Sequence, residues 1–271
     1  MKRSYFFRKI SNYSNIQISS GIRFYLNILV PAIIILGTLL ILRTLGEFPG
    51  LEYSEKDIHT VVTATLVTFS RLIIAYVLAV IFAIPLSLLA GKNNWTKKFL
   101  LPVYDIAQSV PVLIFFPFVI LVFIKLGFAE GAAIFILFIT MLWTLVFSII
   151  SGLNSLPNEI KYTAKMFNIT GFNYLTKILI PSIVPQLTVG SILAFADGWN
   201  FIIIAEVLHT YLPHGTLSND LFGVGSILVM SASGEENVLF VYSLIAIVSM
   251  VVVLNLSIWQ KLLSYAEKFK F

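Results

Sequence analysis

The sequence predicts an all-helical integral membrane protein with six transmembrane helices, and three observations carry that prediction. Of the 271 residues, 58% are hydrophobic and 11% are charged, whereas soluble domains average about 25% charged residues. The mean hydropathy is +0.94, which favours lipid over water as the surroundings. Polar segments separate six apolar runs, each about as long as or longer than the roughly 20 residues that a helix needs to cross a bilayer. The runs cover about 24–42, 61–90, 101–124, 132–152, 180–207 and 238–260.

The elements follow in chain order from the limits of these runs. The first 23 residues are basic and polar and lack the apolar core and cleavage site of a signal peptide, so we expect a cytoplasmic lead-in. The third run contains Ser109-Val110-Pro111 and Pro117, which predict a kinked helix inside a bundle, because neighbouring helices satisfy the carbonyls that proline frees. The predicted parts are the N-terminal segment 1–23, a single transmembrane domain 24–260 and a cytoplasmic tail 261–271.

The lysines and arginines predict which side of the membrane each connection faces. With the N-terminus inside, most of the 18 basic residues fall on inner connections, and Arg43, Lys56 and Lys125 fall on outer ones. Cytoplasmic connections are the ones enriched in Lys and Arg, so both termini are predicted on the cytoplasmic side of a cell (inner) membrane. The outer segments are then 44–60 and 208–237. The second segment contains an apolar stretch too short to span, which we expect to be re-entrant or interfacial.

The chain excludes several classes of chemistry. It has no cysteine, which rules out disulfides, thiolate metal sites and cysteine catalysis. It contains neither the G-x-x-x-x-G-K-[ST] phosphate loop nor a G-x-G-x-x-G turn, so we expect it to bind no nucleotide itself. The histidines, His59, His209 and His214, fall on the outer side, where solvated loop residues are expected rather than a metal site. The net charge of +5 indicates orientation in a membrane rather than nucleic-acid binding.

The hydrophobicity stops between residues 153 and 177, in a connection that the charge pattern places in the cytoplasm. A polar, helix-prone stretch, Pro157–Lys165, begins this connection. A short helix that stops sharply usually ends in a left-handed residue, for which glycine is preferred and asparagine is next, so Asn168 is the predicted stop. Small side chains at Thr163 and Ala164 would let this helix sit closely in the groove of a partner.

The spacing within this connection resembles the cytoplasmic loop of ABC importer permease subunits, written E-A-A-x3-G-x9-I-x-L-P. Here the pattern reads Tyr162-Thr163-Ala164, three residues, Asn168, nine residues, and then Ile178-Leu179-Ile180-Pro181. The spacing holds throughout, whereas the residues at 162, 163, 168 and 180 depart from the identities of the family.

Other stretches in the same order carry the same resemblance. Thr65, Leu66, Thr68 and Arg71 precede Ala83-Ile84-Pro85-Leu86-Ser87, where family members close the span with G-I-P-L-G. Together the stretches look like the nitrate, sulfonate, taurine and bicarbonate branch of the binding-protein-dependent permeases, over about 60–260. The remaining matching stretches are Ser109-Val110-Pro111 with Pro117, Ser151-Gly152-Leu153, Trp199-Asn200 and Ala205-Glu206.

The resemblance implies a type I ABC importer permease fold without covalent chemistry. The cytoplasmic loop 157–171 would act as a coupling helix on a separate ATPase, which would bind ATP and Mg, so no cofactor is expected on this chain. The other implied partners are a second permease copy, identical or different, an extracytoplasmic substrate-binding protein and membrane lipid, with no nucleic acid. The residues implied in ATPase coupling are Glu159, Tyr162, Thr163, Ala164, Lys165, Asn168, Gly171 and Pro181.

Polar residues inside the runs are the candidates for the transport path, because charges in lipid are costly and normally face a bundle interior or an aqueous path. Arg71 and Asp197 fall at similar predicted depth with opposite charge, so we hypothesise an intramembrane ion pair; contact of Arg71 with an anionic substrate is the alternative. Trp199 and Asn200 either line the path or pack and bond against a neighbouring helix. The full candidate set is Arg71, Asp105, Ser109, Asp197, Trp199, Asn200 and Glu206.

Two other functions compete with the importer. A secondary transporter often shows internal inverted repeats, which we do not find, and it would leave the polar loop without an evident role. A membrane-embedded enzyme would need His, Asp or Glu side chains clustered at one depth, whereas the acids here are scattered. The sequence does not identify the solute, although the branch favours a small anion or a small organic solute.

Overall fold

The computed structural model describes residues 55–91, 93–212, 214–234 and 237–269, together with six helical residues between Leu29 and Leu40. The chain divides into two units, 1–48 and 49–271, and the elements below belong to the second. The described residues form helices and short connections without a strand, as the predicted all-helical class requires. The predicted lead-in and most of the first predicted span, 24–42, lie outside the described residues, so both stay predictions.

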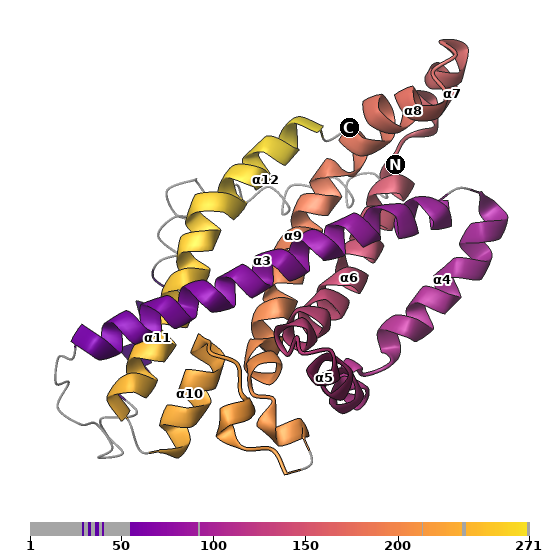
Figure 1. Cartoon of the computed structure of the whole chain (residues 1–271). Coiled ribbons are helices and arrows are strands. Elements are labelled where there is room, and N and C mark those ends of the chain that lie inside the picture. The colour runs from indigo at the N-terminus through magenta and orange to yellow at the C-terminus, as the bar shows by residue number, and fades with distance from the viewer. Residues whose placement is uncertain are drawn as a thin grey trace, which may run out of the picture. The chain divides into compact units, whose positions relative to one another are not determined.

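The helices of the second unit follow one another with mostly short connections, and a longer one links α9 to α10 (Figure 1). In chain order they are α3 (Glu55–Gly91), α4 (Asn94–Ser109), α5 (Phe116–Lys125), α6 (Glu130–Ser155), α7 (Asn158–Met166), α8 (Gly171–Tyr174), α9 (Ile180–Glu206), α10 (Val224–Ser233), α11 (Asn237–Leu254) and α12 (Gln260–Ala266). The 3-10 turns are η1 (Val112–Ile114), η3 (His209–Tyr211), η4 (Leu217–Asn219) and η6 (Glu267–Phe269). The π-helical turns are η2 (Leu175–Leu179) and η5 (Asn255–Trp259).

Four stretches among the described residues are long and apolar enough to cross a membrane. They are Lys56–Gly91, Glu130–Ser155, Gly171–Glu206 and Val238–Phe269, and they correspond to the second, fourth, fifth and sixth predicted runs. The last two stretches pass through the π-helical turns without a break. The fifth helix therefore begins earlier than predicted, and the sixth continues into the predicted tail.

The third predicted run is not a single kinked helix. It is divided into α4 and α5, and the 3-10 turn η1 lies between them. Proline disfavours helical backbone in the residue before it, and Val110, which precedes Pro111, is extended with φ −75° and ψ 120°. Pro117 lies in the first turn of α5, where a missing N–H costs little. The count of six spans is therefore not confirmed by the described residues.

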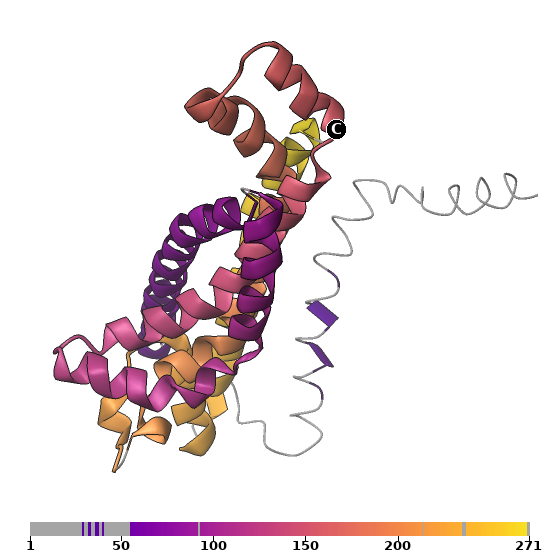
Figure 2. The ribbon, with the colours of Figure 1, turned by 90° about the vertical axis from the view of Figure 1, so that its right-hand side faces the viewer.

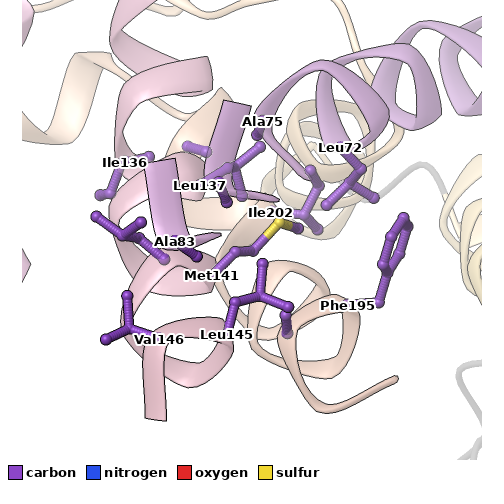
Figure 3. Close-up of a cluster of buried hydrophobic side chains, with 14 of the residues drawn as sticks. Leu72, Ala75, Ala83, Ile136, Leu137, Met141, Leu145, Val146, Phe195 and Ile202 are labelled. Atoms are coloured by element: carbon purple, nitrogen blue, oxygen red, sulfur yellow. The ribbon is translucent and has the colours of Figure 1, made fainter. Parts of the chain in front are cut away.

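The core forms where α6 packs between α3 and α9. On α3, Ala75, Ala79 and Ala83 recur every four residues and are fully buried. Figure 3 shows two of these alanines among larger side chains of α6. Ser87 continues the row, and its hydroxyl donates to the carbonyl of Val146 at 3.0 Å. Small side chains at this spacing let two membrane helices approach closely, which explains why this span keeps small residues.

Glycines on α9 allow an equally close approach to α6. A Cβ added at Gly198 would lie 2.1 Å from Cε of Met141, and one added at Gly190 would lie 2.4 Å from Cβ of Ser148. A side chain at position 190 would therefore push the two helices apart, and one at position 198 would force the side chains of Met141 and Leu72 to move. The structure shows packing at both faces of α6 that a uniformly apolar sequence does not specify.

Two opposite ends of the bundle matter for function. At one end, α7 and α8 project beyond the long helices (Figure 1, and Figure 2 from the side). The C-terminal turn η6 contacts α9 at this same end. At the other end lie α5, α10 and the connection between α9 and α10 (Figures 1 and 2). We call these the α7 end, predicted to be cytoplasmic, and the α10 end, predicted to be outside.

Candidate functional site: the two ends of the bundle

The α7 loop ends its helix at the residue that the sequence predicted. Asn168 has φ +52°, in the left-handed region that glycine and asparagine tolerate best. Its N–H donates to the carbonyl of Lys165 at 3.1 Å, and the N–H of Ile169 donates to the carbonyl of Ala164 at 2.9 Å. These two bonds make a complete Schellman motif, which satisfies carbonyls that the helix end leaves free. The predicted role of Asn168 as the helix stop is confirmed.

A second left-handed residue and a proline set the return of the chain into the bundle. Gly171 has φ +58° and is the first residue of α8. Pro181 lies in the first turn of α9, two residues after the π-helical turn ends. Proline clashes with the carbonyl four residues earlier, so the wider π-helical turn before it keeps the helix continuous. The backbone at these positions thus sets the turns of the loop.

The side chains that the loop exposes are large rather than small. Tyr162, Met166, Phe167 and Phe172 are between 65% and 82% exposed, whereas Ala164 is 2% exposed. The methyl group of Ala164 therefore packs inside the loop and does not face a partner, contrary to the expectation from its small size. We refer to the four exposed residues as the loop's apolar side chains.

The charges and hydroxyl of α7 support the helix itself. Glu159 lies in the first turn and Lys165 in the last turn, and both side chains are exposed. Each has the sign that stabilises its end of the helix dipole. The hydroxyl of Thr163 donates to the carbonyl of Glu159 at 2.8 Å, within the same helix. These residues stabilise a short helix that has few contacts with the bundle.

The α10 end contains a buried cluster of charges around Arg71. Its Nε and Nη2 donate to the two carboxylate oxygens of Glu130, at 2.5 and 2.7 Å. Its Nη1 donates to Oε1 of Glu206 at 2.6 Å, and Nη2 also donates to the carbonyl of Phe222 at 2.9 Å. The side chain of Arg71 is 3% exposed. One guanidinium from α3 therefore joins the start of α6, the end of α9 and the segment before α10.

Glu206 is fully buried, and its carboxylate is held from three directions. Besides Arg71, the hydroxyl of Thr68 donates to it at 2.6 Å and the N–H of Gly225 donates at 2.7 Å. The N–H of Val224 in turn donates to the hydroxyl of Thr68 at 3.0 Å. The carboxylate thus lies at the N-terminus of α10, where the helix dipole favours negative charge.

The approach of α10 to Glu206 requires glycine. A Cβ added at Gly223 would lie 2.2 Å from the carboxylate, and one added at Gly225 would lie 2.9 Å from it. The first distance is far shorter than a carbon and an oxygen tolerate, and the second is also too short. The glycines are therefore needed for close approach at this contact.

A family comparison assigns this architecture. The sequence from residue 83 to residue 265 matches the model of the binding-protein-dependent transport system inner membrane component, which is more than half of the chain. The chain belongs to that family. It is a binding-protein-dependent ABC transporter permease, as the resemblance of the α7 loop implied.

Curated relatives and a solved structure agree with this assignment. The permease is 32% identical over 143 residues to the nitrate import permease protein NrtB of Synechococcus elongatus, covering 53% of this chain and 50% of the relative. It is 25% identical to the bicarbonate transport system permease protein CmpB of the same species, over 61% of this chain and 58% of the relative. It is 21% identical to the taurine transport system permease protein TauC of Escherichia coli, over 52% and 50%. The chain thus spans about half the length of the curated relatives it matches.

The structural comparison shows the fold. A chain of the MetNI methionine ABC transporter, in inward-facing conformations, aligns with a TM-score of 0.67 at 14% identity. The alignment covers 79% of this permease and 99% of that chain. The permease therefore has the type I importer fold that the resemblance implied.

The ion pair predicted between Arg71 and Asp197 is wrong. Arg71 pairs with Glu130 and Glu206, while Asp197 accepts a hydrogen bond from the hydroxyl of Thr144 at 2.5 Å. Glu206 lies nine residues beyond Asp197 on α9, which is about 14 Å along a helix axis. The predicted depths of Arg71 and Asp197 were obtained by counting residues from the limits of the two apolar runs. α3 extends outward to Glu55 and crosses α9 obliquely, so Arg71 lies nearer the outer end (Figure 1).

The alternative role of Arg71, contact with an anionic substrate, finds no support in this structure, because four of its N–H bonds point to internal partners. Trp199 is half-buried and packs against the core. The remaining candidates are exposed on the surface of the chain: Asp105, Ser109 and Asn200. The structure therefore brings two of the predicted candidates together, Arg71 and Glu206, and places the others apart.

Sequence reasoning missed Glu130, the second partner of Arg71. Glu130 is the first residue of α6, and its side chain is 42% exposed. The signal was its place directly before an apolar run, which puts a carboxylate at the outer limit of a span. His209 also differs from expectation. Its Nδ1 lies 2.7 Å from Oδ2 of Asp220, so it is half-buried in the outer connection rather than solvated.

Proposed function

We propose that this permease forms the translocation path of an ATP-driven importer together with a second permease chain, and that a separate ATPase drives it through the α7 loop. The observation that carries the proposal is that the loop combines well-defined backbone turns with exposed apolar side chains. Without a partner, the exposure of Met166, Phe167 and Phe172 to water does not stabilise the loop. Exposed apolar patches of this kind mark sites of protein association.

The described shape of the loop suits the transmission of force. Two left-handed residues, Asn168 and Gly171, flank the turn after α7. The chain then continues without a break through η2 into α9, which carries Glu206 at its other end. A displacement of the loop by a partner would therefore act directly on a membrane-spanning helix. The partner ATPase would bind ATP and Mg, and the energy of that binding would supply the displacement.

A second permease chain would complete the path. Large apolar side chains on α4 and α5 are exposed, among them Ile106 and Phe118. The exposed polar residues Asp105 and Ser109 lie on α4, beside this apolar surface. A partner chain facing these residues would enclose a polar path between two apolar borders. The same surface serves an identical or a different second permease.

The solute proposed is small, with an anion favoured. The names of the relatives include nitrate, bicarbonate and taurine, and these proteins share the family of this chain. The description of the family as binding-protein-dependent supports an extracytoplasmic binding protein as the partner at the α10 end. The proposed location is the cell (inner) membrane, with both termini in the cytoplasm.

The test replaces one of the loop's apolar side chains. Met166→Glu places a charge at an 82% exposed position, and we expect about tenfold less ATPase subunit to co-purify, with ATP-dependent uptake falling in parallel. The matched control, Leu217→Glu, alters an exposed apolar side chain at the α10 end and should retain the ATPase. Normal co-purification and uptake in Met166→Glu would overturn the coupling assignment. Uptake driven by an ion gradient without ATP would indicate a secondary transporter instead.

A further inference from the structure

A pocket of about 590 Å³ opens at the α7 end, between the ends of the long helices and the loop. The end of α3, the start of α4, the end of α6 and the segment from α7 to η2 all contribute to it. Its lining divides into two kinds of side chain. The polar ones are Asn93, Lys97, Asn154, Lys161 and Tyr174. The large apolar ones are Leu88, Leu153, Leu175 and Leu179.

The charge of this pocket is positive. Lys97 and Lys161 line it, and its lining contains no carboxylate. Nζ of Lys97 donates to Oδ1 of Asn154 at 2.6 Å, which leaves two of its three N–H donors for another acceptor. Among the described residues, the salt bridges involve Arg71 and His209, and neither of these two lysines takes part. The pocket therefore offers two ammonium groups without a bound anion from the chain itself.

Aromatic side chains that flank Lys97 in the sequence indicate the depth in the membrane that we expect for the pocket. Trp95 and Phe99 are exposed on the first turns of α4, and their rings stack with centroids 6.1 Å apart and planes 9° from parallel. Tryptophan beside lysine is typical of the membrane–water interface, where the lipid headgroups lie. Lys97 lies between these two aromatic residues in the sequence, so we expect its ammonium near the level of the headgroups.

We propose that this pocket binds the headgroup phosphate of an anionic phospholipid. Lys97 and Lys161 share the phosphate, while the four leucines contact the glycerol and the first carbons of the acyl chains. The apolar half of the lining favours a lipid over a free anion, because a free phosphate makes no favourable contact with leucine side chains. Basic pockets between membrane helices on the cytoplasmic side bind such headgroups, and the cytoplasmic leaflet supplies anionic lipids.

The bound lipid would join two elements that otherwise meet weakly. Lys97 belongs to α4 and Lys161 to α7. A phosphate between them holds the start of the loop against the bundle. The lipid composition of the membrane would then tune how firmly the loop is held. The binding itself does not depend on which solute is carried or on the ATPase.

Native mass spectrometry of the full-length chain tests this site. The purified protein is incubated with equal amounts of phosphatidylglycerol and phosphatidylcholine, and with inorganic phosphate alone in a separate sample. We expect retained phosphatidylglycerol over phosphatidylcholine, and about tenfold weaker retention in the Lys97→Gln/Lys161→Gln variant. The matched control is Lys98→Gln/Lys165→Gln, which removes two exposed lysines from the same two helices outside this pocket and should bind as the unaltered chain does.

Three results would overturn the proposal. Equal loss of phosphatidylglycerol in both double variants would mean a general charge effect rather than this pocket. Equal retention of the two lipids would mean that the phosphate charge is not recognised. Retention of inorganic phosphate that matches that of phosphatidylglycerol, and that depends on the same lysines, would assign the pocket to a free anion.

Discussion

The α10 end and the α7 end of the bundle differ in whether their side chains find partners within the chain. At the α10 end, Arg71 and Glu206 are almost completely buried and bind each other and the backbone of α10. At the α7 end, Lys161 has no carboxylate partner within the described residues, and side chains such as Met166 face water. The buried charges of the α10 end are therefore satisfied within a single chain. The α7 end presents groups that a partner or a lipid would complete.

The difference has an energetic cause. Removing a charge from water costs several kcal/mol unless a partner compensates for it. Each buried charge of the α10 end therefore depends on its partner for stability. The contacts of the α7 end are few, and its shape depends on backbone turns at Asn168 and Gly171. The proposed coupling to an external subunit would benefit from this arrangement, because the turns shape the loop without buried charges that attach it to the bundle.

The largest expected effect comes from removing the cation of the α10 end. Arg71→Met leaves the fully buried Glu206 without its counter-charge, and we expect a loss of about 3–5 kcal/mol in the free energy of unfolding. Thermal unfolding in detergent and the yield of folded protein measure it. Arg71→Met/Glu206→Met should recover part of the loss. Glu130→Gln is the milder control, because Glu130 is 42% exposed. An unchanged unfolding temperature in Arg71→Met would contradict the buried pairing.

An intermediate effect is expected from Gly223→Ala, which breaks the fit rather than the charge. The new Cβ would lie 2.2 Å from the carboxylate of Glu206, and we expect a loss of about 1–3 kcal/mol from overpacking. Gly91→Ala is the matched control, because its Cβ would meet the terminal methyl of Leu153 at 3.1 Å, and that side chain can move. Equal unfolding temperatures for the two variants would show that α10 does not depend on this close approach.

The smallest effect is expected at the α7 end. Asn168→Ala places a Cβ without a polar group at φ +52°, which costs about 1 kcal/mol locally. Because the loop is not part of the core, hydrogen exchange of the α7 amides should rise while global unfolding stays unchanged. Asn168→Gly should keep the slow exchange of the unaltered chain. Faster exchange in both variants, or in neither, would count against the left-handed stop.

Local patterns in the sequence predicted much of this protein. The length of the apolar runs located the four spanning helices among the described residues, and the spacing to Pro181 located the loop. Asn168 was identified as a helix stop because that role depends on the backbone of one residue. Spacing and small side chains also carried the resemblance to a permease family that the full comparison confirmed.

Other features were predicted incorrectly because residue types and their spacing do not by themselves fix the path of the backbone. The side chain of Ala164 was expected to face a partner, yet the way the loop folds back buries it. The run over 101–124 was expected to be one helix, yet Pro111 ends α4 and leaves two helices. Composition gave no means to distinguish a kink from a full break.

The sequence by itself determined that this chain is a helical membrane protein with a polar loop, because run length is a property of the chain in one dimension. The spacing of its motifs carried the resemblance to the permease family that the comparison confirmed. The tertiary structure alone decided that Arg71 binds Glu130 and Glu206 rather than Asp197. The physical reason is that α3, at 37 residues and about 56 Å, is longer than a bilayer is thick and crosses its neighbours obliquely. Depth counted along one helix therefore does not give the depth on another.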